Sequence, residues 1–271
     1  MFSYVKSSMA DLRPLLNEYA ESLSSPIDSF LEDHITDSKF VEIRAGEEIS
    51  GYYAVYEGKL LTQFFLRSSA QREAQEIFNR VLEESQVDSL FVPTCDELFL
   101  SMVVDRDFQM DKQAYFFQDG LVPLPEPGLK EGEEFRLATP GDIEAIRTVC
   151  GDFIQHHEPM VAAEQLYVYY KGTLLMGIGV MEKGRIMTDH ASVGMFVNEA
   201  YRRQGIGRSI ILQMKNRSYE LGLTPICGCW YYNTLSKLTL ESAGMVTKTR
   251  LLKVSFEAGT QKRKTTFLNN R

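Results

Sequence analysis

The sequence predicts a mixed α/β protein of the α+β kind, in which a mostly antiparallel sheet is flanked by helices and the arrangement occurs twice. Two observations predict this fold class. Strand-like and helix-like hydrophobic patterns follow one another through the second half of the chain. Three short motifs of that half also recur, in the same order, in the first half. A chain of 271 residues is long enough for two such domains.

The recurring motifs are a strand followed by a helix start, a strand-turn-strand hairpin, and a polar residue that opens a helix after a strand. In the first motif, Asp11 and Asp142 are placed to cap the first helix of each half. A tandem duplication is favoured over chance by three matches in order. The matching pairs are Tyr4–Leu15 with Phe135–Ile146, Tyr56–Leu61 with Tyr170–Leu175, and Asp96–Leu98 with Asn233–Leu235.

A segment between the halves is typical of a linker. Gly120–Glu134 holds three prolines and three glycines. We therefore expect one domain over residues 1–125 and a second over 133–260. The basic tail Gln261–Lys264 is expected to be loose.

The elements of the second half follow from hydrophobic periodicity, glycines and polar breaks. Four cysteines are expected to be reduced thiols, and Trp230 is expected in the core. The predicted strands cover 134–138, 166–171, 174–182, 188–197, 224–230 and 245–257, and the predicted helices cover 142–156, 205–221 and 234–243.

One junction carries most of the functional information. A buried strand, Val193–Val197, ends just before a glycine loop with Gly205 and Gly207, and a helix follows. Backbone N–H groups at a helix start have no intrahelical acceptor, and the helix dipole favours an anion there. Arg203 and Arg208 can add charge-assisted hydrogen bonds. The junction therefore predicts a pyrophosphate-binding loop; the alternative is a glycine-rich turn that carries ordinary surface arginines.

The loop matches neither common nucleotide fingerprint. A Walker loop needs a lysine after its glycines, and none follows here. A dinucleotide fingerprint needs a third glycine at the position of Ile210. The remaining pattern, Arg202 with Gly205 and Gly207, resembles the signature of the GNAT superfamily of acyl-CoA-dependent N-acyltransferases.

The resemblance implies a GNAT fold, with the strands before and after the loop splayed to admit the pantetheine arm of acetyl-CoA. A second segment, from Asn233 to Met245, is similar to the family's helix beside pantetheine. The first half has no Gly-x-Gly after its equivalent strand, where Arg67–Arg72 stands, so it is expected to be a degenerate copy without a cofactor site. The cofactor-binding residues implied are Met195, Phe196, Val197, Arg202, Arg203, Gln204, Gly205, Ile206, Gly207, Arg208, Ser209, Asn233 and Ser236.

Two positions depart from the family pattern. The usual general-acid tyrosine is replaced by Leu240, and a common glutamate base is replaced by Gly228. Proton handling must then come from other groups or from water. We expect His190 to act as base or relay, because its ordinary pKa is suitable, and Tyr232 to act as acid. For His190, a surface histidine at a strand start is the competing interpretation.

Composition limits the partners. The formal net charge is −8, which argues against a nucleic-acid binder and is compatible with a cationic amine substrate. No signal peptide is visible at the start and no apolar run is long enough for a membrane span, so a cytoplasmic protein is expected. The histidines and cysteines show no metal-ligand spacing, so no metal site is expected.

The predicted function is an N-acetyltransferase that moves acetyl from acetyl-CoA to a primary amine of a small molecule or peptide, by direct attack in a ternary complex. The alternatives are a non-catalytic acyl-CoA-binding or sensor protein, which the two departures motivate, and a structural interaction domain. The identity of the acceptor and self-association into a homodimer are left open.

Overall fold

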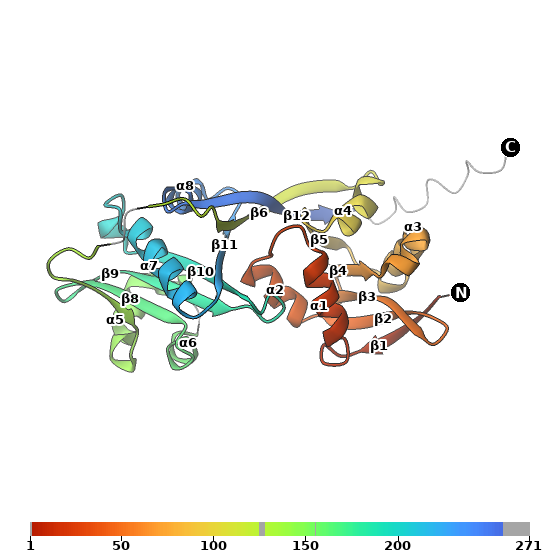
Figure 1. Ribbon diagram of the computed structural model, residues 1–271, viewed down its shortest axis with the longest axis horizontal. Helices are drawn as coiled ribbons and strands as arrows, with labels where there is room; N and C mark the ends of the chain where they lie inside the picture. The colour runs from red at the N-terminus through yellow and green to blue at the C-terminus, as the bar shows by residue number, and fades with distance from the viewer. Residues whose placement is uncertain (1, 125–127, 155, 257–271) are drawn as a thin grey trace. The chain divides into compact units, whose positions relative to one another are not determined.

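The computed structural model describes residues 2–124, 128–154 and 156–256 of the chain, so the tail at 261–264 lies outside the described residues. The chain forms two compact units (Figure 1). The first unit comprises Met1–Ser25, Phe30–Ala114 and the chain from Thr249; the second comprises Pro26–Ser29 and Tyr115–Lys248. Each unit combines separate segments of the chain, whereas the expected domains, 1–125 and 133–260, are consecutive. The expected domain boundaries stay a prediction. No described helix has the length and apolarity that a bilayer span requires.

The first unit is built on a sheet in the order β1-β2-β3-β4-β5-β12, in which β12 (Met245–Ser255) comes from the second half of the sequence. Neighbouring strands are antiparallel except β4 and β5, which are parallel. The elements from the first half of the sequence are β1 (Phe2–Ser7), α1 (Arg13–Ser22), α2 (Ser29–Thr36), β2 (Lys39–Ala45), β3 (Glu48–Tyr56), β4 (Leu60–Leu66), η1 (Ser68–Glu73), α3 (Ala74–Ser85), β5 (Ser89–Pro93), α4 (Glu97–Val104) and β6 (Gln109–Asp119).

The second unit repeats this plan in the order β6-β11-β10-β9-β8-β7. β10 and β11 are parallel, and the neighbours from β10 to β7 are antiparallel. Helix α7 packs against β9, β10 and β11 (Figure 1). The elements are β7 (Glu133–Leu137), η2 (Pro140–Asp142), α5 (Ile143–Cys150), η3 (Gly151–Phe153), α6 (His157–Ala162), β8 (Leu166–Lys171), β9 (Leu174–Lys183), β10 (His190–Val197), η4 (Glu199–Tyr201), α7 (Ile206–Glu220), β11 (Thr224–Trp230), α8 (Thr234–Ser242) and β12 (Met245–Ser255).

Both halves of the sequence run through the same order of elements, so the predicted fold class with two tandem copies is confirmed. Of the three motif pairs that the sequence comparison aligned, the hairpin pair does not join equivalent strands. The Tyr56–Leu61 turn joins the third and fourth strands of its half, whereas the Tyr170–Leu175 turn joins the second and third. The true equivalent of Gly172 is Gly46, since both turn the chain between the second and third strands with positive φ, +57° and +65°.

Each unit receives its last strand from the other half of the sequence. β12 leaves the second unit after Lys248, and its remainder pairs antiparallel with β5 from Leu251–Pro93 to Ser255–Ser89. In the same way β6 begins in the first unit and ends in the second, beside β11. A division into two consecutive domains misses this exchange, because hydrophobic periodicity does not tell which strand a given strand will pair with.

Asp11 and Asp142 stabilise the turn that precedes the first helix of each half, and not the helix itself as expected. Neither makes a side-chain cap to its helix. Instead, Asp142 accepts hydrogen bonds from the Thr139 N–H and hydroxyl (both 2.7 Å), which forms a capping box. Asp11 is bonded in the same way to Ser8, whose hydroxyl donates to its carboxylate at 2.6 Å. The two halves thus share a Ser/Thr-x-x-Asp turn.

The predicted helix 142–156 is shorter in the structure. α5 ends at Cys150 because Gly151 takes a left-handed φ of +52°, and α6 begins only at His157. Most other boundaries of the second half agree within two residues with the prediction.

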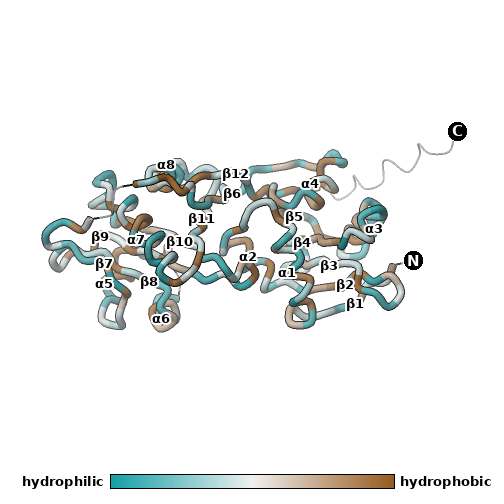
Figure 2. The backbone as a smooth tube through the Cα atoms, viewed as in Figure 1, coloured by the Kyte–Doolittle hydropathy of each residue, from teal (hydrophilic) through white to brown (hydrophobic). Residues whose placement is uncertain are grey.

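The cores lie where the helices cover the sheets. In the first unit one group of buried side chains joins β3–β5 to α3 and α4. In the second unit, one group lies under α7 and α8 and another under α5 and α6, on the opposite face of the sheet. Figure 2 shows polar and apolar stretches alternating along α7 and α8, as expected for helices with one face on a sheet.

Candidate functional site

The two strands on either side of the glycine loop separate. β10 and β11 pair only from His190–Thr224 to Ser192–Ile226. Beyond that rung, β10 continues to pair with β9 as far as Val197, but not with β11. Its last four residues are therefore half-buried rather than buried. The strands splay as the family resemblance implies. We call the interval between the diverging parts of β10 and β11 the gap, and β10 leads from it into the glycine loop.

The loop after β10 presents unused backbone donors. Arg203 and Gly205 both have positive φ, +63° and +83°, and such left-handed residues turn successive N–H groups toward one side. Ser209 is the first residue whose N–H reaches an acceptor in the turn, the Gly205 carbonyl at 3.0 Å. Among the described residues, the N–H groups of 203–208 have no backbone acceptor. This is the donor arrangement that a pyrophosphate requires.

The loop is held from beneath by Asn198. Its side-chain oxygen accepts from the Ala200 N–H at 3.2 Å, and its amide donates to the Leu175 carbonyl at 3.1 Å. These two bonds tie the start of the turn that leads into the loop to β9.

The three arginines differ in what they contact. Arg202 forms an ion pair with Glu199 at 3.0 Å, and its guanidinium lies over the Phe196 ring. Arg208 donates to the Ser242 carbonyl at 2.8 Å, at the C-terminal end of α8. Arg203 is exposed and forms no hydrogen bond or ion pair with any residue that the structure describes. Arg203 is thus the arginine whose charge is open to a ligand, whereas the other two also support the protein.

The two glycines of the loop serve different purposes. Gly205 has open space where a side chain would stand, and its left-handed φ is what requires glycine. A Cβ at Gly207 would lie 3.0 Å from Thr239 and 3.3 Å from Val197. A side chain at position 207 would therefore press on α8 and on the end of β10, whatever it does to a ligand.

A cavity of about 230 Å³ adjoins the loop on the side of β7 and β8. The sequence did not indicate the residues that close it, because they lie in the proline-rich segment and on a distant strand. The Tyr169 hydroxyl donates to Glu133 at 2.7 Å, and burial together with this bond raises the pKa of Tyr169. Its lining is Gly128, Lys130, Glu133, Tyr169, Gln204, Gly205, Ile206, Arg208, Ser209 and Leu212.

Asn233 caps α8, and its side-chain oxygen accepts from the Ser236 N–H at 3.1 Å. The corresponding residue of the first half, Asp96, caps α4 through the Phe99 N–H at 2.9 Å. Capping therefore explains Asn233 without a cofactor, and its contact with pantetheine stays a prediction.

The two predicted catalytic side chains are not close to one another along the sheet. His190 is at the paired end of β10, where its ring lies 2.6 Å from the Asp189 carboxylate. Tyr232 follows the other end of β11 and is 62% exposed. Trp230 beside it is 58% exposed, so its predicted core position is wrong. Both rings are exposed at the end of β11, and their exposure depends on tertiary packing that periodicity alone could not indicate.

A carboxylate from elsewhere in the sequence occupies the space beside Gly228. A Cβ built on Gly228 would overlap the side chain of Asp28, which is buried. The next residue, Ser29, donates its N–H to the Ser192 hydroxyl at 3.4 Å. Sequence reasoning missed Asp28, because it lies in the first half of the chain and in the loop between α1 and α2.

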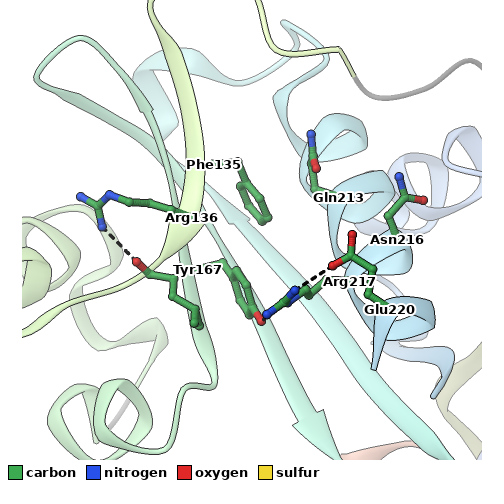
Figure 3. A pocket seen from close by; sticks show the side chains of 8 residues that line it. Phe135, Arg136, Tyr167, Gln213, Asn216, Arg217 and Glu220 are labelled. Carbon is green, nitrogen blue, oxygen red and sulfur yellow. Dashed lines mark hydrogen bonds and ion pairs between the residues drawn. The ribbon is translucent and has the colours of Figure 1, made fainter. Parts of the chain in front are cut away.

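A second cavity of about 320 Å³ lies farther along α7 (Figure 3). The Phe135 and Tyr167 rings stack there at 5.6 Å, and Arg217 donates to Glu220 at 2.7 Å. Because the Arg217 charge is matched within the protein, this cavity is less suited to an anionic cofactor than the glycine loop.

The first half lacks each feature of the loop. Every residue of β4 is buried, although β4 and β5 also part after two rungs. The residues from Arg67 to Ala74 have no positive φ, and Arg67 is bonded to Glu18 at 2.8 Å. The gap is filled and the donors are not turned outward, which accords with a degenerate copy.

The cysteines are free thiols. Burial foremost, and then the charges of Cys229 and Asp28, raise the pKa of Cys227 well above its ordinary value. Cys227 is therefore a protonated thiol at neutral pH, which is a poor nucleophile and a poor metal ligand. Among the residues that the structure describes, no group of three or more His, Cys, Asp or Glu side chains could hold a metal ion.

Comparison with known proteins gives a family match for the first half and a shared fold for the whole chain. Residues 8–120 match a family model described as an acetyltransferase (GNAT) domain. The match falls on the first half of the chain, which has no glycine loop. No curated protein matches the chain.

Solved structures show the same fold over nearly the whole chain. A GNAT-family acetyltransferase from Colwellia psychrerythraea is 19% identical, with a TM-score of 0.82, and the alignment covers 95% of this chain and 100% of that one. A tandem GNAT protein from the clavulanic acid biosynthesis pathway is 13% identical, with a TM-score of 0.65 and coverage of 96% and 99%. A GCN5-related N-acetyltransferase from Sphaerobacter thermophilus is 14% identical, with a TM-score of 0.64 and coverage of 93% and 94%.

Proposed function

We propose that the second unit binds acetyl-CoA and transfers the acetyl group to a primary amine of a small molecule or peptide. The proposal is supported by the acetyltransferase (GNAT) family model that matches residues 8–120 and by the fold that the whole chain shares with a GNAT-family structure. The observation that carries this proposal is the gap between β10 and β11, which ends at six unused backbone donors, 203–208. The pyrophosphate would be bound by these N–H groups and by Arg203. The pantetheine arm would lie along Met195–Val197.

Direct attack of the amine in a ternary complex is the mechanism that the side chains support. A covalent route would need a nucleophile near the gap, and the Cys227 thiol is kept protonated by its surroundings. Binding of the nucleotide portion, remote from the thioester, would position the reacting carbonyl. A backbone N–H near Phe196 and Val197 is proposed to stabilise the developing oxyanion.

A non-catalytic acyl-CoA-binding protein is the second candidate. It is favoured by Leu240, which is buried and apolar where the family's acid would be, and by Gly228, which has no side chain.

Two measurements test the proposal. Calorimetry with CoA should give one CoA per chain, since only the second half has the loop. A steady-state assay with acetyl-CoA and a panel of primary amines (spermidine, lysine, glucosamine and a short peptide) should give amine-dependent release of CoA thiol. Binding without transfer to any amine would leave the second candidate, and two CoA per chain would refute the assignment of the first half.

A further inference from the structure

We infer that Asp28 is the catalytic base of this transfer, supplied to the second unit by a loop from the first half of the sequence. The inference rests on the proposed acetyl transfer and adds the residue that accepts the amine's proton. Asp28 belongs to Pro26–Ser29, the short segment of the first half that clusters with the second unit.

The position of Asp28 in the gap follows from the pairing register. The last rung shared by β10 and β11 is Ser192–Ile226, so the next residues on the same face are Gly194 and Gly228. Because both of these residues are glycines, neither strand contributes a side chain at this level. The Asp28 carboxylate occupies the space beside Gly228, and the Ser29 N–H is bonded to the Ser192 hydroxyl. Residues 28 and 29 therefore lie where the strands begin to separate.

The face of the sheet is also the right one for an acceptor. Val193, Met195 and Val197 contact the core under α7 and α8, on the side of the glycine loop helix. Gly194, Gly228 and Asp28 lie on the opposite face, because side chains alternate along a strand. Cofactor and acceptor could thus approach the same gap from two sides, with the carboxylate on the acceptor side.

The chemistry requires a group of this kind. A primary amine arrives as an ammonium ion, which a carboxylate attracts and orients. The ammonium loses one proton to Asp28, which passes it to solvent. The nitrogen lone pair then attacks the thioester carbon, the C–N bond forms and the C–S bond breaks. The second proton that nitrogen loses ends on the departing thiolate.

Asp28 is better placed for this step than His190. His190 lies on the same face but four residues before Gly194, which is about 13 Å along the strand. Its ring is also bonded to Asp189, beside the part of the sheet that is still paired.

The test uses the full-length chain and whichever amine of the panel the parent acetylates. Asp28→Asn keeps the shape of the side chain and removes the base, so we expect unchanged CoA affinity in calorimetry and a fall in kcat of about 10²–10⁴-fold. Asp28→Gly should lose kcat in the same way, and added formate should restore part of it, since a small carboxylate can enter the vacated space. Asp37→Asn, an exposed carboxylate change one helix away, is the matched control and should leave kcat unchanged.

The outcomes separate this inference from the proposed function. If the parent acetylates an amine and Asp28→Asn turns over within a few-fold of it, the role of Asp28 is wrong and the acetyl transfer stands. If the parent binds CoA but acetylates no amine, the proposed acetyl transfer and the role of Asp28 as base are both wrong. A loss in Asp28→Gly that formate does not reverse, together with a changed CoA affinity, would indicate that Asp28 only supports the fold.

Discussion

Glycine is needed at positions 205 and 207 for different reasons. Substitutions at the two positions should therefore have different effects. Gly205 is required by its backbone conformation, whereas Gly207 is required by its contact with α8. The first requirement concerns the shape of the donor loop, and the second concerns the packing of two helices.

We predict that Gly205→Ala weakens CoA binding with a loss of stability of only about 1 kcal/mol, because the Cβ meets nothing but the left-handed φ is strained. Calorimetry with CoA and thermal denaturation measure the two effects. Gly46→Ala is the control, since Gly46 has a similar φ of +65°, open space for a Cβ and no place in the loop. Equal CoA affinity in Gly205→Ala and Gly46→Ala would contradict the role of the loop.

Gly207→Val should behave differently. Its side chain would press on Thr239 and Val197, and overpacking of this kind destabilises by about 1–3 kcal/mol. Denaturant unfolding should show the loss in the absence of CoA. A Gly207→Val variant as stable as the parent would mean that α8 moves away without resistance.

A buried aspartate makes the first unit sensitive to pH. Burial raises the pKa of Asp96 to about 7, although the Phe99 N–H and the Tyr19 hydroxyl favour its charged form. The folded pKa is above the unfolded one, so the folded state holds the proton more tightly. This contribution to stability is fully present below about pH 4 and is lost as the pH rises to about 7.

The measurement is the free energy of unfolding at pH 5 and pH 8 for the parent and for Asp96→Asn. Asparagine can still cap α4 and does not titrate. We expect the parent to lose stability relative to the variant as the pH rises, by up to about 4 kcal/mol over the full range. Parallel pH profiles for the two proteins would show that Asp96 titrates normally.

At the scale of elements, an ion pair holds the end of β6 in the second unit. The Lys215 ammonium lies 2.8 Å from the Asp119 carboxylate, and both side chains are buried. The Tyr219 hydroxyl donates to the same carboxylate at 2.7 Å, and Lys215 also donates to the Ala243 carbonyl at 3.1 Å. The cluster joins the exchanged strand to α7 and to the end of α8.

Asp119→Ala should destabilise the chain by about 3–5 kcal/mol, because it leaves the Lys215 charge buried without its carboxylate. The double variant Asp119→Ala/Lys215→Met should lose less than Asp119→Ala, since no charge then remains buried. Urea unfolding of the parent, of the single variants Asp119→Ala and Lys215→Met, and of the double variant gives the comparison. Additive losses would show that the two groups do not interact.

At the scale of the whole molecule, the exchange of β6 and β12 makes each unit depend on the other half of the sequence. Without β12, the strand β5 would present the unpaired backbone groups that now pair from Ser89 to Pro93. An edge of this kind promotes association with other chains.

We therefore predict that residues 1–124 expressed alone aggregate or fail to unfold cooperatively, and that co-expression with residues 128–271 restores a soluble complex. Size-exclusion chromatography and circular dichroism distinguish the two results. The control is the intact chain with a protease site inserted between residues 124 and 128, which should stay folded after cleavage. Cooperative unfolding of the 1–124 fragment alone would contradict the interdependence.

The extent of sequence-based prediction differs between parts of the site. The strand, the loop and the helix around Gly205 could be predicted because hydrophobic period, glycine conformation and helix-end donors are local properties. The exposed position of Trp230 could not, since it depends on which parts of the sheet are covered by other elements in the folded chain. The equivalence of the turns at Gly46 and Gly172 was also missed, because one glycine turn resembles another until the strand order is known.

The sequence by itself determined the fold class, the duplication, the difference between a half with a glycine loop and a half without one, and the place of the glycine loop. Only the tertiary structure decided that β6 and β12 are exchanged and that Asp28 lies beside Gly228. The physical reason is the distance along the sequence over which each interaction acts. Periodicity, capping and turn conformation act over a few residues, whereas strand exchange and the Asp28–Gly228 contact join residues that are far apart in the chain and meet only when the sheets are formed.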